Sequence, residues 1–330
     1  MSSASTTRAD TTVADPGPPS QGAAGPPRGW KRYQASTFYA FVGPWVLGLI
    51  LLTAFPMGFA LWMSFTNYDG ISPSTSYVGF DNYARALEDV DLRQAMVITL
   101  LLMFVVVPLT ISFGLMMALL VNAPLRERST YRAILYLPAV LPVTAGAMAF
   151  RMVFDQDVGP VNGILSALGM DVVPWLTGND AFWVLFAYMM WGIGGSMVIS
   201  LAALQGVPLE LHEAAAIDGA GAIQRFFRIT LPMISPLVLF QVITGVIGAI
   251  QMFVPVLIIG NDQMSAASVT GVPSGMRVYM LYVYQTYFAQ ADMGYASAML
   301  WLLFIVIVLF TAAVFLSSRR FVYYATGDRQ

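Results

Sequence analysis

Six stretches of this chain are apolar over a length that can cross a lipid bilayer. They lie near residues 38–64, 95–121, 133–154, 182–204, 233–259 and 294–317. Each holds about 20 or more mainly apolar residues, the length that a helix needs to span the hydrocarbon core. Inside a bilayer every backbone polar group must be bonded within the protein, and a helix does this within one segment. Only 10% of the residues are charged, whereas soluble domains have about 25%. We therefore predict an all-α fold, a polytopic transmembrane helical bundle with six spans.

The basic residues are distributed unevenly between the two sides of such a bundle. If the loops alternate between the sides, twelve of the 16 Lys and Arg residues fall on the side of the N-terminus. The other four are Arg85, Arg93, Arg151 and Arg277. Cytoplasmic loops of membrane proteins carry an excess of Lys and Arg. This distribution predicts a multi-pass protein of the cytoplasmic membrane with both termini, and the segment 207–232, in the cytoplasm.

Residues 1–32 differ in composition from the rest of the chain. They are rich in Ser, Thr, Ala, Pro and Gly, so we expect a disordered cytoplasmic tail followed by a transmembrane domain over 33–330. A signal peptide is the competing interpretation, but its apolar core would span about 7–15 residues. No charged residue occurs from Tyr33 to Tyr68, so the first span is expected to be a retained anchor.

The segment 207–232 between the fourth and fifth spans is called the elbow below. Pro208 suits the first turn of a helix, and Leu209 to Asp218 are mostly good helix formers. That helix would be about 16 Å long, too short to cross a bilayer. Gly219 and Gly221 are expected to end it, because glycine accepts the left-handed conformation found at helix ends.

A second short helix is expected after these glycines. Ile223, Phe226 and Phe227 follow at helical spacing, with polar residues on the opposite side. That pattern is typical of an amphipathic helix at a membrane surface, and Pro232 is expected to stop it. The elbow is therefore predicted to be a helix–turn–helix lying at the membrane face.

The elbow resembles the coupling loop of ABC importer permeases, whose pattern is E-A-A, three residues, G, nine residues and I-x-L-P. The matching positions are Glu213, Ala214, Ala215, Gly219, Ile229, Leu231 and Pro232, with no departure from the spacing. The resemblance implies the type I permease fold and a short helix that sits in a groove of a separate ATPase. Glu213 and Gly219 are the residues expected to act there. The alternative is a connector that only turns the chain around.

Three further segments resemble the carbohydrate-uptake, maltose-transporter-like subfamily of these permeases. They are YVGFDNY over 77–83, the loop with Gly159, Asn162, Leu168, Gly169, Trp175 and Leu176, and the C-terminal RRFVYY over 319–324. In the first outer loop Phe80, Tyr83, Ala84 and Leu87 recur at i, i+3, i+4 and i+7. This spacing predicts an amphipathic helix on the outer surface.

Several kinds of chemistry are excluded or disfavoured by residues that the chain lacks. It has no G-x-x-x-x-G-K-[ST] loop, and its single lysine is Lys31, so it is not expected to hydrolyse ATP itself. ATP and Mg²⁺ are assigned to a partner ATPase, and no cofactor to this chain. With no cysteine and one histidine, His212, no metal site is predicted. No basic patch favours nucleic acid, and the spans lack the Asp, Glu or Lys of a proton relay.

Polar and aromatic residues gather in the fourth and fifth spans. The candidates for a substrate path are Tyr188, Trp191, Gly192, Gly195, Gln241, Thr244 and Gln251. Sugars present C–H faces that stack on aromatic rings and hydroxyls that need hydrogen-bond partners. Tyr188, Trp191 and Gly195 fall near one helix face. The alternative is ordinary helix packing, because small residues and hydroxyls commonly line membrane helix interfaces.

Together these features predict a transport subunit rather than an enzyme: the permease subunit of a binding-protein-dependent ABC importer for a sugar or oligosaccharide. The resemblance implies three kinds of partner, namely a second permease subunit, an ABC ATPase dimer and an extracytoplasmic solute-binding protein. Two alternatives stay open. One is a permease of the same fold for another solute such as glycerol phosphate, which the scarcity of basic residues in the spans disfavours. The other is a secondary carrier or membrane enzyme without ATP coupling, which has no reason to keep the elbow motif.

Overall fold

A computed structural model describes residues 35–72, 74–123, 126–261 and 271–321. The chain forms two compact units, residues 1–56 and 57–330. The described residues are mainly helical, and the extended pairing found among them is a single antiparallel bridge between Thr66 and Tyr77. The prediction of an all-α fold is confirmed. The predicted tail, 1–32, lies outside the described residues, as do residues 322–324 of the C-terminal motif.

The first unit holds the beginning of the first span. Helix α1 (Ala35–Leu49) runs into the π-helical turn η1 (Ile50–Ala54). Pro44 lies inside α1 without ending it, as membrane helices tolerate. Together with α2 (Phe55–Ser64), these elements form one apolar helix over Thr37–Ser64. This helix confirms the first predicted span.

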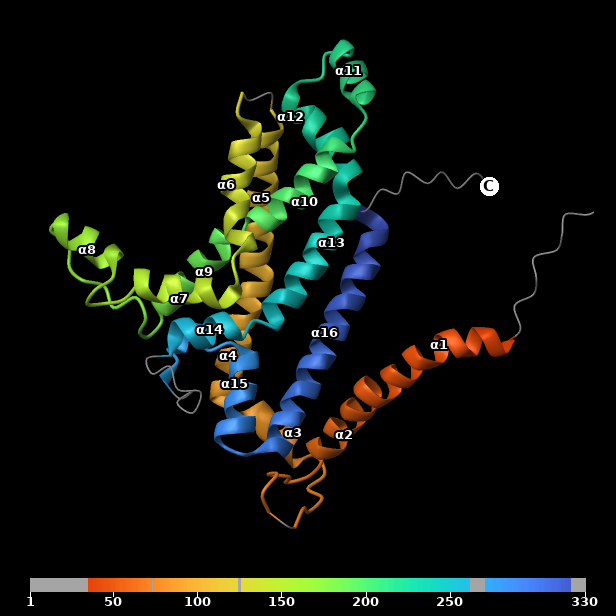
Figure 1. Cartoon of the computed structure of the whole chain (residues 1–330), viewed down its shortest axis with the longest axis vertical. Coiled ribbons are helices and arrows are strands. Elements are labelled where there is room, and N and C mark those ends of the chain that lie inside the picture. The colour runs from red at the N-terminus through yellow and green to blue at the C-terminus, as the bar shows by residue number, and fades with distance from the viewer. Residues whose placement is uncertain (1–34, 73, 124–125, 262–270, 322–330) are drawn as a thin grey trace, which may run out of the picture. The chain divides into compact units, whose positions relative to one another are not determined.

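Among the described residues of the second unit, four continuous helices are long and apolar enough to cross a membrane (Figure 1). They cover Val90–Asn122, Ala181–Gln205, Ala222–Ile250 and Met293–Ser317. Their elements are α4 (Val90–Leu101), η2 (Leu102–Val106), α5 (Val107–Asn122), α9 (Ala181–Trp191), α10 (Gly194–Gln205), α12 (Ala222–Arg225), η3 (Phe226–Thr230), α13 (Leu231–Ile250) and α16 (Met293–Phe321). The connections carry α3 (Asp81–Glu88), α8 (Pro160–Ala167), α11 (Leu209–Ile217), α14 (Val254–Gly260), η5 (Ser274–Met276), α15 (Tyr279–Tyr284) and η6 (Gln285–Ala289).

The third span is not the single helix predicted over 133–154. It consists of α6 (Arg128–Val140) and α7 (Val143–Val153), bent by 94° at the break between them. Pro142 causes the break, because a proline pushes the preceding residue out of the helical conformation. Leu141 accordingly has a ψ of 142°. The chain therefore has five continuous candidate spans and one bent pair within its described part.

The fifth span also differs from the prediction of 233–259. Its helix stops at Ile250, residues 251–253 are not helical, and α14 begins separately at Val254. At the other end, Pro232 does not stop the elbow's second helix. The π-helical turn η3 comes just before it and shifts the hydrogen-bond register, so the missing proline N–H falls within the first turn of α13, where it is tolerated. One helix therefore runs from the elbow at Ala222 to Ile250.

Close packing joins α5, α10 and α13 along this helix. A Cβ added to Gly114 of α5 would lie 2.5 Å from Ser196 Oγ of α10, so the contact needs a glycine. Gln241 of α13 is buried and accepts a hydrogen bond from Ser196 Oγ at 2.5 Å. It also donates to Ser200 Oγ at 3.1 Å. A small residue for close approach and a bonded amide are usual ways to hold membrane helices together.

Candidate functional site

The first helix of the elbow, α11, follows Pro208 as the sequence predicts. Gly219 has a φ of +79°, the left-handed conformation expected just after a helix. The Ala220 N–H then donates to the Ala215 carbonyl at 2.9 Å, which closes the last turn. Gly221 has a φ of −67°, which any residue can adopt. The prediction that it shares the left-handed conformation is wrong.

The E-A-A end of the motif is open to contact. Glu213 and Ala214 are exposed and Ala215 is half-buried. No residue of α11, which is described throughout, is buried. Large apolar side chains are also exposed on the elbow, namely those of Leu209, Leu211, Ile217, Ile223 and Phe227. Exposed apolar groups clustered on one segment favour a protein contact, and Leu209 and Ile217 are contributors that sequence reasoning missed.

The I-x-L-P end of the motif is anchored in the bundle. Ile229, Leu231 and Pro232 are half-buried, and Thr230 between them is buried. Leu231 packs against a buried cluster that includes Met197 of α10. The two ends of the motif therefore have different surroundings: one is fixed to the spans and the other is free to meet a partner.

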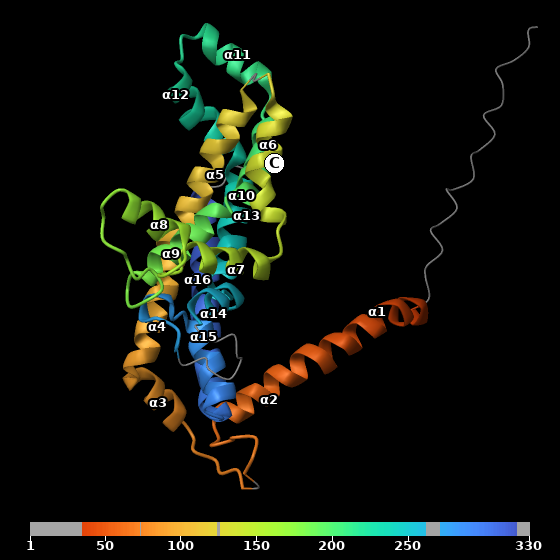
Figure 2. The same cartoon turned by 60° about the vertical axis from the view of Figure 1, so that its left-hand side comes forward.

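A cavity of about 230 Å³ lies where three helix breaks meet. Its lining residues are Pro138, Ala139, Leu141, Pro142, Val143, Gly146, Tyr188, Met189, Trp191, Gly192 and Met252. They come from the bend between α6 and α7, the turn between α9 and α10, and the non-helical residues after α13. Figures 1 and 2 both show α7, α9 and α14 grouped together at this level. Transporters commonly build solute sites at such interruptions of their membrane helices.

Aromatic rings form one wall of this cavity. The Tyr188 hydroxyl donates to the Val143 carbonyl at 3.3 Å. The ring of Phe150 lies 5.3 Å from that of Tyr188 and 5.4 Å from that of Trp191, centroid to centroid. A Cβ added to Gly146 would lie 3.0 Å from the Trp191 ring, so glycine there admits the indole. Sequence reasoning missed Gly146 and Phe150, because they face Trp191 only once the third span bends.

The predicted substrate-path residues separate into two groups. Tyr188, Trp191 and Gly192 line the cavity, and Gly195 lies beside it, with a hypothetical Cβ 3.9 Å from Ala139 Cβ. The other three lie elsewhere: Gln241 is in the α10–α13 contact, Thr244 is exposed with its Oγ1 bonded to the Phe240 carbonyl at 2.9 Å, and Gln251 is exposed at the end of α13. For Gln241 the arrangement matches the helix-packing alternative.

The cavity has the chemistry of a site for an uncharged solute. None of the described residues that line it is charged. Within the described part of the chain, no three His, Asp or Glu side chains converge so as to hold a metal ion. The polar side-chain groups of the lining are the Tyr188 hydroxyl and the Trp191 indole N–H, to which the helix breaks add backbone groups. These features suit a molecule with one apolar face and several hydroxyls.

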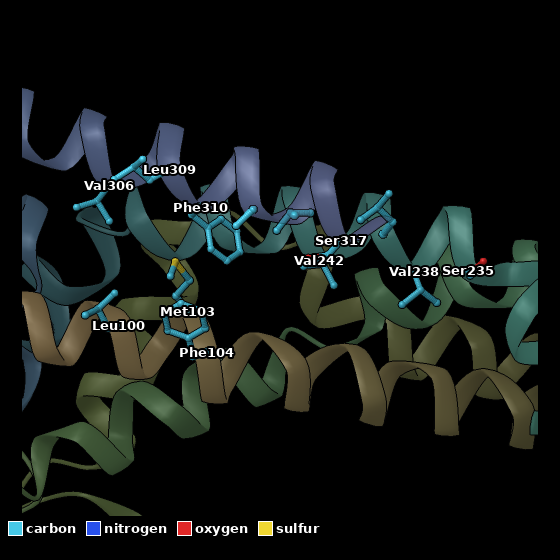
Figure 3. A pocket seen from close by; sticks show the side chains of 13 residues that line it. Leu100, Met103, Phe104, Ser235, Val238, Val242, Val306, Leu309, Phe310 and Ser317 are labelled. Carbon is cyan, nitrogen blue, oxygen red and sulfur yellow. The ribbon is translucent and has the colours of Figure 1, made fainter. Parts of the chain in front are cut away.

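A larger groove of about 700 Å³ runs between α4, η2, α13 and α16 (Figure 3). Its described lining is apolar apart from Ser235 and Ser317, and includes Met103, Phe104 and Phe310. It holds none of the predicted path residues. Because its walls offer few groups that could replace the hydration of a polar solute, the smaller cavity is the better candidate site despite its size.

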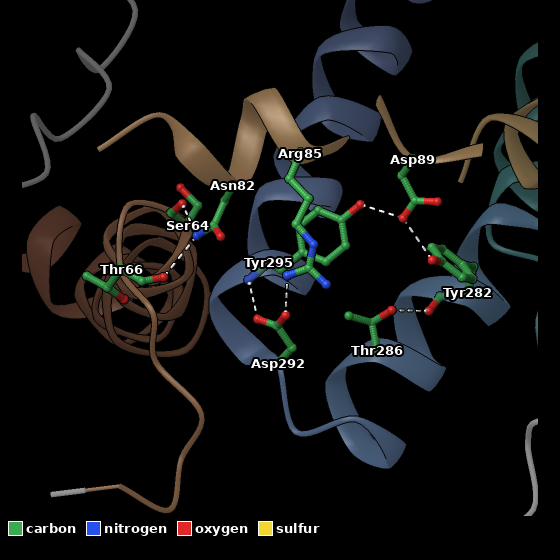
Figure 4. A network of polar contacts seen from close by, with 9 residues as sticks. All are labelled: Ser64, Thr66, Asn82, Arg85, Asp89, Tyr282, Thr286, Asp292 and Tyr295. Atoms are coloured by element: carbon green, nitrogen blue, oxygen red, sulfur yellow. Dashed lines mark hydrogen bonds and ion pairs between the residues drawn. The ribbon is translucent and has the colours of Figure 1, made fainter. Parts of the chain in front are cut away.

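A polar network ties the loop between the first and second spans to the start of the last span (Figure 4). Asp89 Oδ2 accepts hydrogen bonds from the hydroxyls of Tyr282, at 2.8 Å, and Tyr295, at 2.7 Å. Arg85 Nη1 lies 2.6 Å from Asp292 Oδ2, and its guanidinium stacks over the Tyr295 ring at 4.0 Å. Burial of the Asp89 carboxyl raises its pKa, but bonds from the Leu92 N–H and the two hydroxyls outweigh this, so the pKa is lowered.

The same network gives a structural role to the YVGFDNY segment. The Asn82 amide donates to the carbonyls of Ser64, at 3.0 Å, and Thr66, at 2.9 Å, where the first span ends. Helix α3 forms where the spacing of apolar residues predicts a helix. Phe80 and Leu87 are exposed, whereas Asn82 and Ala86 are buried. The Tyr83 hydroxyl also lies 2.7 Å from Ser64 Oγ, so α3 turns both its amide and its aromatic ring toward the end of the first span.

Comparison with known proteins adds a family and a fold. Residues 110–325 match the model of the family described as binding-protein-dependent transport system inner membrane component. A probable ABC transporter permease of Bacillus subtilis, YesP, is 34% identical over 294 residues, covering 88% of this chain and 93% of that protein. The diacetylchitobiose uptake system permease NgcF of Streptomyces coelicolor is 33% identical over 329 residues, covering 94% and 90%.

A solved structure has the same architecture. It is a chain of a bacterial alginate ABC transporter in complex with an alginate pentasaccharide-bound periplasmic protein. The TM-score is 0.74 with 23% sequence identity, over 86% of this chain and 94% of that one. At this identity the likeness concerns the fold alone.

Proposed function

The chain belongs to the binding-protein-dependent transport system inner membrane components, and on that premise we propose that its cargo is a sugar or oligosaccharide. The cavity at the three helix breaks carries this proposal. The Trp191 ring offers a face on which the C–H side of a pyranose can stack, and the Tyr188 hydroxyl offers a hydrogen bond. The diacetylchitobiose permease named above supports a saccharide cargo.

An anionic solute such as glycerol phosphate is the second candidate, and the cavity argues against it. Phosphate recognition in proteins relies on Arg, Lys or clustered backbone N–H groups. The described lining residues include no Arg or Lys. A neutral saccharide needs no counter-charge, so it fits this lining better.

We further propose that ATP and Mg²⁺ are used by a separate ATPase dimer that docks on the exposed E-A-A end of the elbow. The complex would also contain a second permease subunit and an extracytoplasmic solute-binding protein. In this arrangement the elbow and both termini lie in the cytoplasm, residues 1–32 are a tail, and 33–330 act as one permease domain. The positive-inside distribution of Lys and Arg supports the orientation.

One continuous helix links the elbow to the cavity and so provides a path for coupling ATP hydrolysis to transport. Movement of the elbow would pass along the continuous helix Ala222–Ile250 to the non-helical residues 251–253, where Met252 lines the cavity. The packing of Gln241 between Ser196 and Ser200 would carry the same movement to α10. ATP-driven closure of the ATPases would thus change the access of the cavity.

The test is uptake by the reconstituted importer carrying Trp191→Ala, with Trp183→Ala as the matched control. Trp183 lies on the same helix, is exposed, and is outside the cavity. Losing one stacking ring costs roughly 1 kcal/mol, about fivefold in apparent affinity. We expect that loss for Trp191→Ala alone, with neutral oligosaccharides as cargo. Equal uptake by both variants, or uptake of glycerol phosphate instead of saccharides, would contradict the assignment of the cavity.

A further inference from the structure

Four aromatic rings lie in contact with one another beyond the cavity, on the side away from the elbow. The ring of Phe253 lies 4.6 Å from that of Tyr284, centroid to centroid. The ring of Phe288 lies 4.7 Å from that of Tyr284 and 4.8 Å from that of Tyr287. These four residues are called the aromatic row below. Figures 1 and 2 both show α15, which ends at Tyr284, between α14 and α3. The row therefore leads from the level of the cavity toward the end of the bundle where α3 lies.

The row meets the cavity at Phe253. The preceding residue, Met252, lines the cavity, and both residues belong to the non-helical link between α13 and α14. Exposure decreases along the row toward the cavity: Phe288 is 64% exposed, whereas Tyr284 and Phe253 are half-buried and pack against the main core. The rings thus connect the open surface to the cavity without a gap between successive members.

The segment that carries the outer rings is fixed from its other side. Gln285 and Thr286 are buried, and Thr286 Oγ1 donates to the Tyr282 carbonyl at 3.0 Å (Figure 4). The Asp292 N–H donates to the Thr286 carbonyl at 3.0 Å, which closes the turn after η6. Within that turn Ala291 has a φ of +53°, a conformation that few residues other than glycine adopt. Such strain persists where the surroundings impose it, and it is commonest at functional sites.

The row also has hydrogen-bonding groups to spare. No protein group within the described part of the chain bonds the hydroxyls of Tyr284 and Tyr287. The hydroxyls of Tyr279 and Tyr282, by contrast, donate to the Met299 carbonyl and to Asp89. A tyrosine that serves only to pack the core usually has its hydroxyl bonded within the protein. The two free hydroxyls can donate to and accept from the hydroxyls of a solute.

We propose that the aromatic row is a second saccharide-binding site, which receives the sugar on the side opposite the elbow and passes it to the cavity. This inference rests on the saccharide cargo proposed above. Successive rings are 4.6–4.8 Å apart, so a sugar ring can begin to stack on the next aromatic face before it leaves the last one. In the orientation proposed above, this is the side on which the solute-binding protein delivers its cargo. The exposed Gln251, a predicted path residue outside the cavity, lies two positions before Phe253 and adds an amide near the inner end of the row.

The test is uptake of radiolabelled neutral di- and trisaccharides by the reconstituted importer, with its partner subunits and with loaded binding protein at saturating concentration. Phe288→Leu removes the outermost ring, and Phe288→Tyr keeps an aromatic ring there. Phe80→Leu is the matched control, because Phe80 is also an exposed phenylalanine, at 71%, and its ring contacts are with Phe65 and Tyr83. Hydrolysis stimulated by the loaded binding protein is measured on the same vesicles.

We expect Phe288→Leu to lower the maximal rate of uptake several-fold, with Phe288→Tyr and Phe80→Leu close to wild type and stimulated hydrolysis retained in all three. Equal uptake by Phe288→Leu and Phe80→Leu would overturn the proposal, and so would a loss that Phe288→Tyr does not restore. Loss of stimulated hydrolysis in Phe288→Leu would also overturn it, because this residue would then contact the binding protein and not the sugar.

The row and the cavity can fail separately in this experiment. If Trp191→Ala loses apparent affinity while Phe288→Leu behaves as wild type, the row is not a site and the cavity stands. If Trp191→Ala has no effect either, the assignment of the cavity fails, and the row has no site to supply. If the wild-type importer accumulates none of the saccharides, the proposed cargo is wrong, and the inference fails with it.

Discussion

At the scale of single residues, backbone conformation distinguishes two glycines that look alike in the sequence. Gly219 and Gly221 both follow α11, but only Gly219 has a positive φ, +79°. No neighbour lies within 4 Å of a Cβ added at either position. The need for glycine at 219 therefore comes from the backbone and not from crowding.

Gly219→Val should disturb the elbow where Gly221→Val does not. An L-residue in the left-handed region costs about 1–2 kcal/mol, and more for a β-branched one. We expect Gly219→Val to insert normally but to lose co-purification with the ATPase, with Gly221→Val close to wild type. Equal behaviour of the two variants would show that the turn conformation does not matter for docking.

Asp89 accepts hydrogen bonds from Tyr282 and Tyr295 in the polar network of Figure 4, and its titration gives a second prediction. Its pKa is lowered in the folded chain, so the unfolded chain binds the proton more tightly. The stabilisation is therefore fully present above the ordinary carboxyl value of 3.8 and is lost as the pH falls through the lowered value. An asparagine at this position does not titrate. In Asp89→Asn, the loss of stability that protonation of Asp89 causes at low pH should therefore be absent.

The measurement is the thermal midpoint of the detergent-solubilised protein from neutral pH down to about pH 3, a range that reaches below the ordinary Asp pKa. Asp157→Asn serves as the control, because Asp157 is exposed and outside this network. If Asp89→Asn and wild type lose stability in parallel as the pH falls, the network does not depend on this carboxylate.

At the scale of elements, the sequence predicts helices well and their interruptions poorly. Length and apolarity are enough to locate five spans, and the helix formers after Pro208 are enough to locate α11. The 94° bend at Leu141–Pro142 and the gap at 251–253 could not be predicted in the same way. Pro44 and Pro236 lie inside continuous helices, so a proline in the sequence does not by itself predict a break in a helix.

Some residues of the candidate site could be predicted from the sequence and others could not. Tyr188 and Trp191 could be proposed because aromatic residues near a glycine stand out within an apolar span. Gly146 and Phe150 could not, since only the bend of the third span brings them to Trp191. In the sequence, Gln241 is a candidate ligand for sugar hydroxyls, but its two serine partners lie on α10, 45 and 41 positions away. Such long-range pairing leaves no local signal.

Pro142→Ala tests whether the bend shapes the cavity. Without the ring, Leu141 is free to become helical, and the free energy that holds α6 and α7 apart falls. We expect saccharide uptake to drop several-fold while expression and ATPase association persist. Pro236→Ala is the control, because that proline lies within α13 and does not line the cavity. Unchanged uptake by Pro142→Ala would mean that tertiary packing alone sets the bend.

At the scale of the whole molecule, the two candidate regions are separate in space and joined by one helix. The elbow is exposed at its E-A-A end, and the cavity is at the opposite end of Ala222–Ile250. A change in the elbow should therefore affect energy coupling without altering solute recognition. A change in the cavity should do the reverse. This separation gives the last prediction.

Glu213→Lys should uncouple the importer, and Glu210→Lys should not. Both glutamates lie on α11, both are exposed, and either substitution changes the charge by the same amount. Only Glu213 belongs to the motif proposed to contact the ATPase. Reversing a charge at a protein contact costs several kcal/mol when it meets an unfavourable partner. We expect Glu213→Lys to lose ATPase association and the hydrolysis stimulated by loaded binding protein, measured in reconstituted vesicles.

The comparison with Trp191→Ala makes the result specific. That variant should keep association with the ATPase and lose apparent affinity for the saccharide, whereas Glu213→Lys should keep the affinity of any residual uptake and lose its rate. If Glu213→Lys and Glu210→Lys lose association to the same extent, only the net charge of α11 matters. If neither loses it, the ATPase docks elsewhere, and the continuous helix from Ala222 does not carry the signal to the cavity.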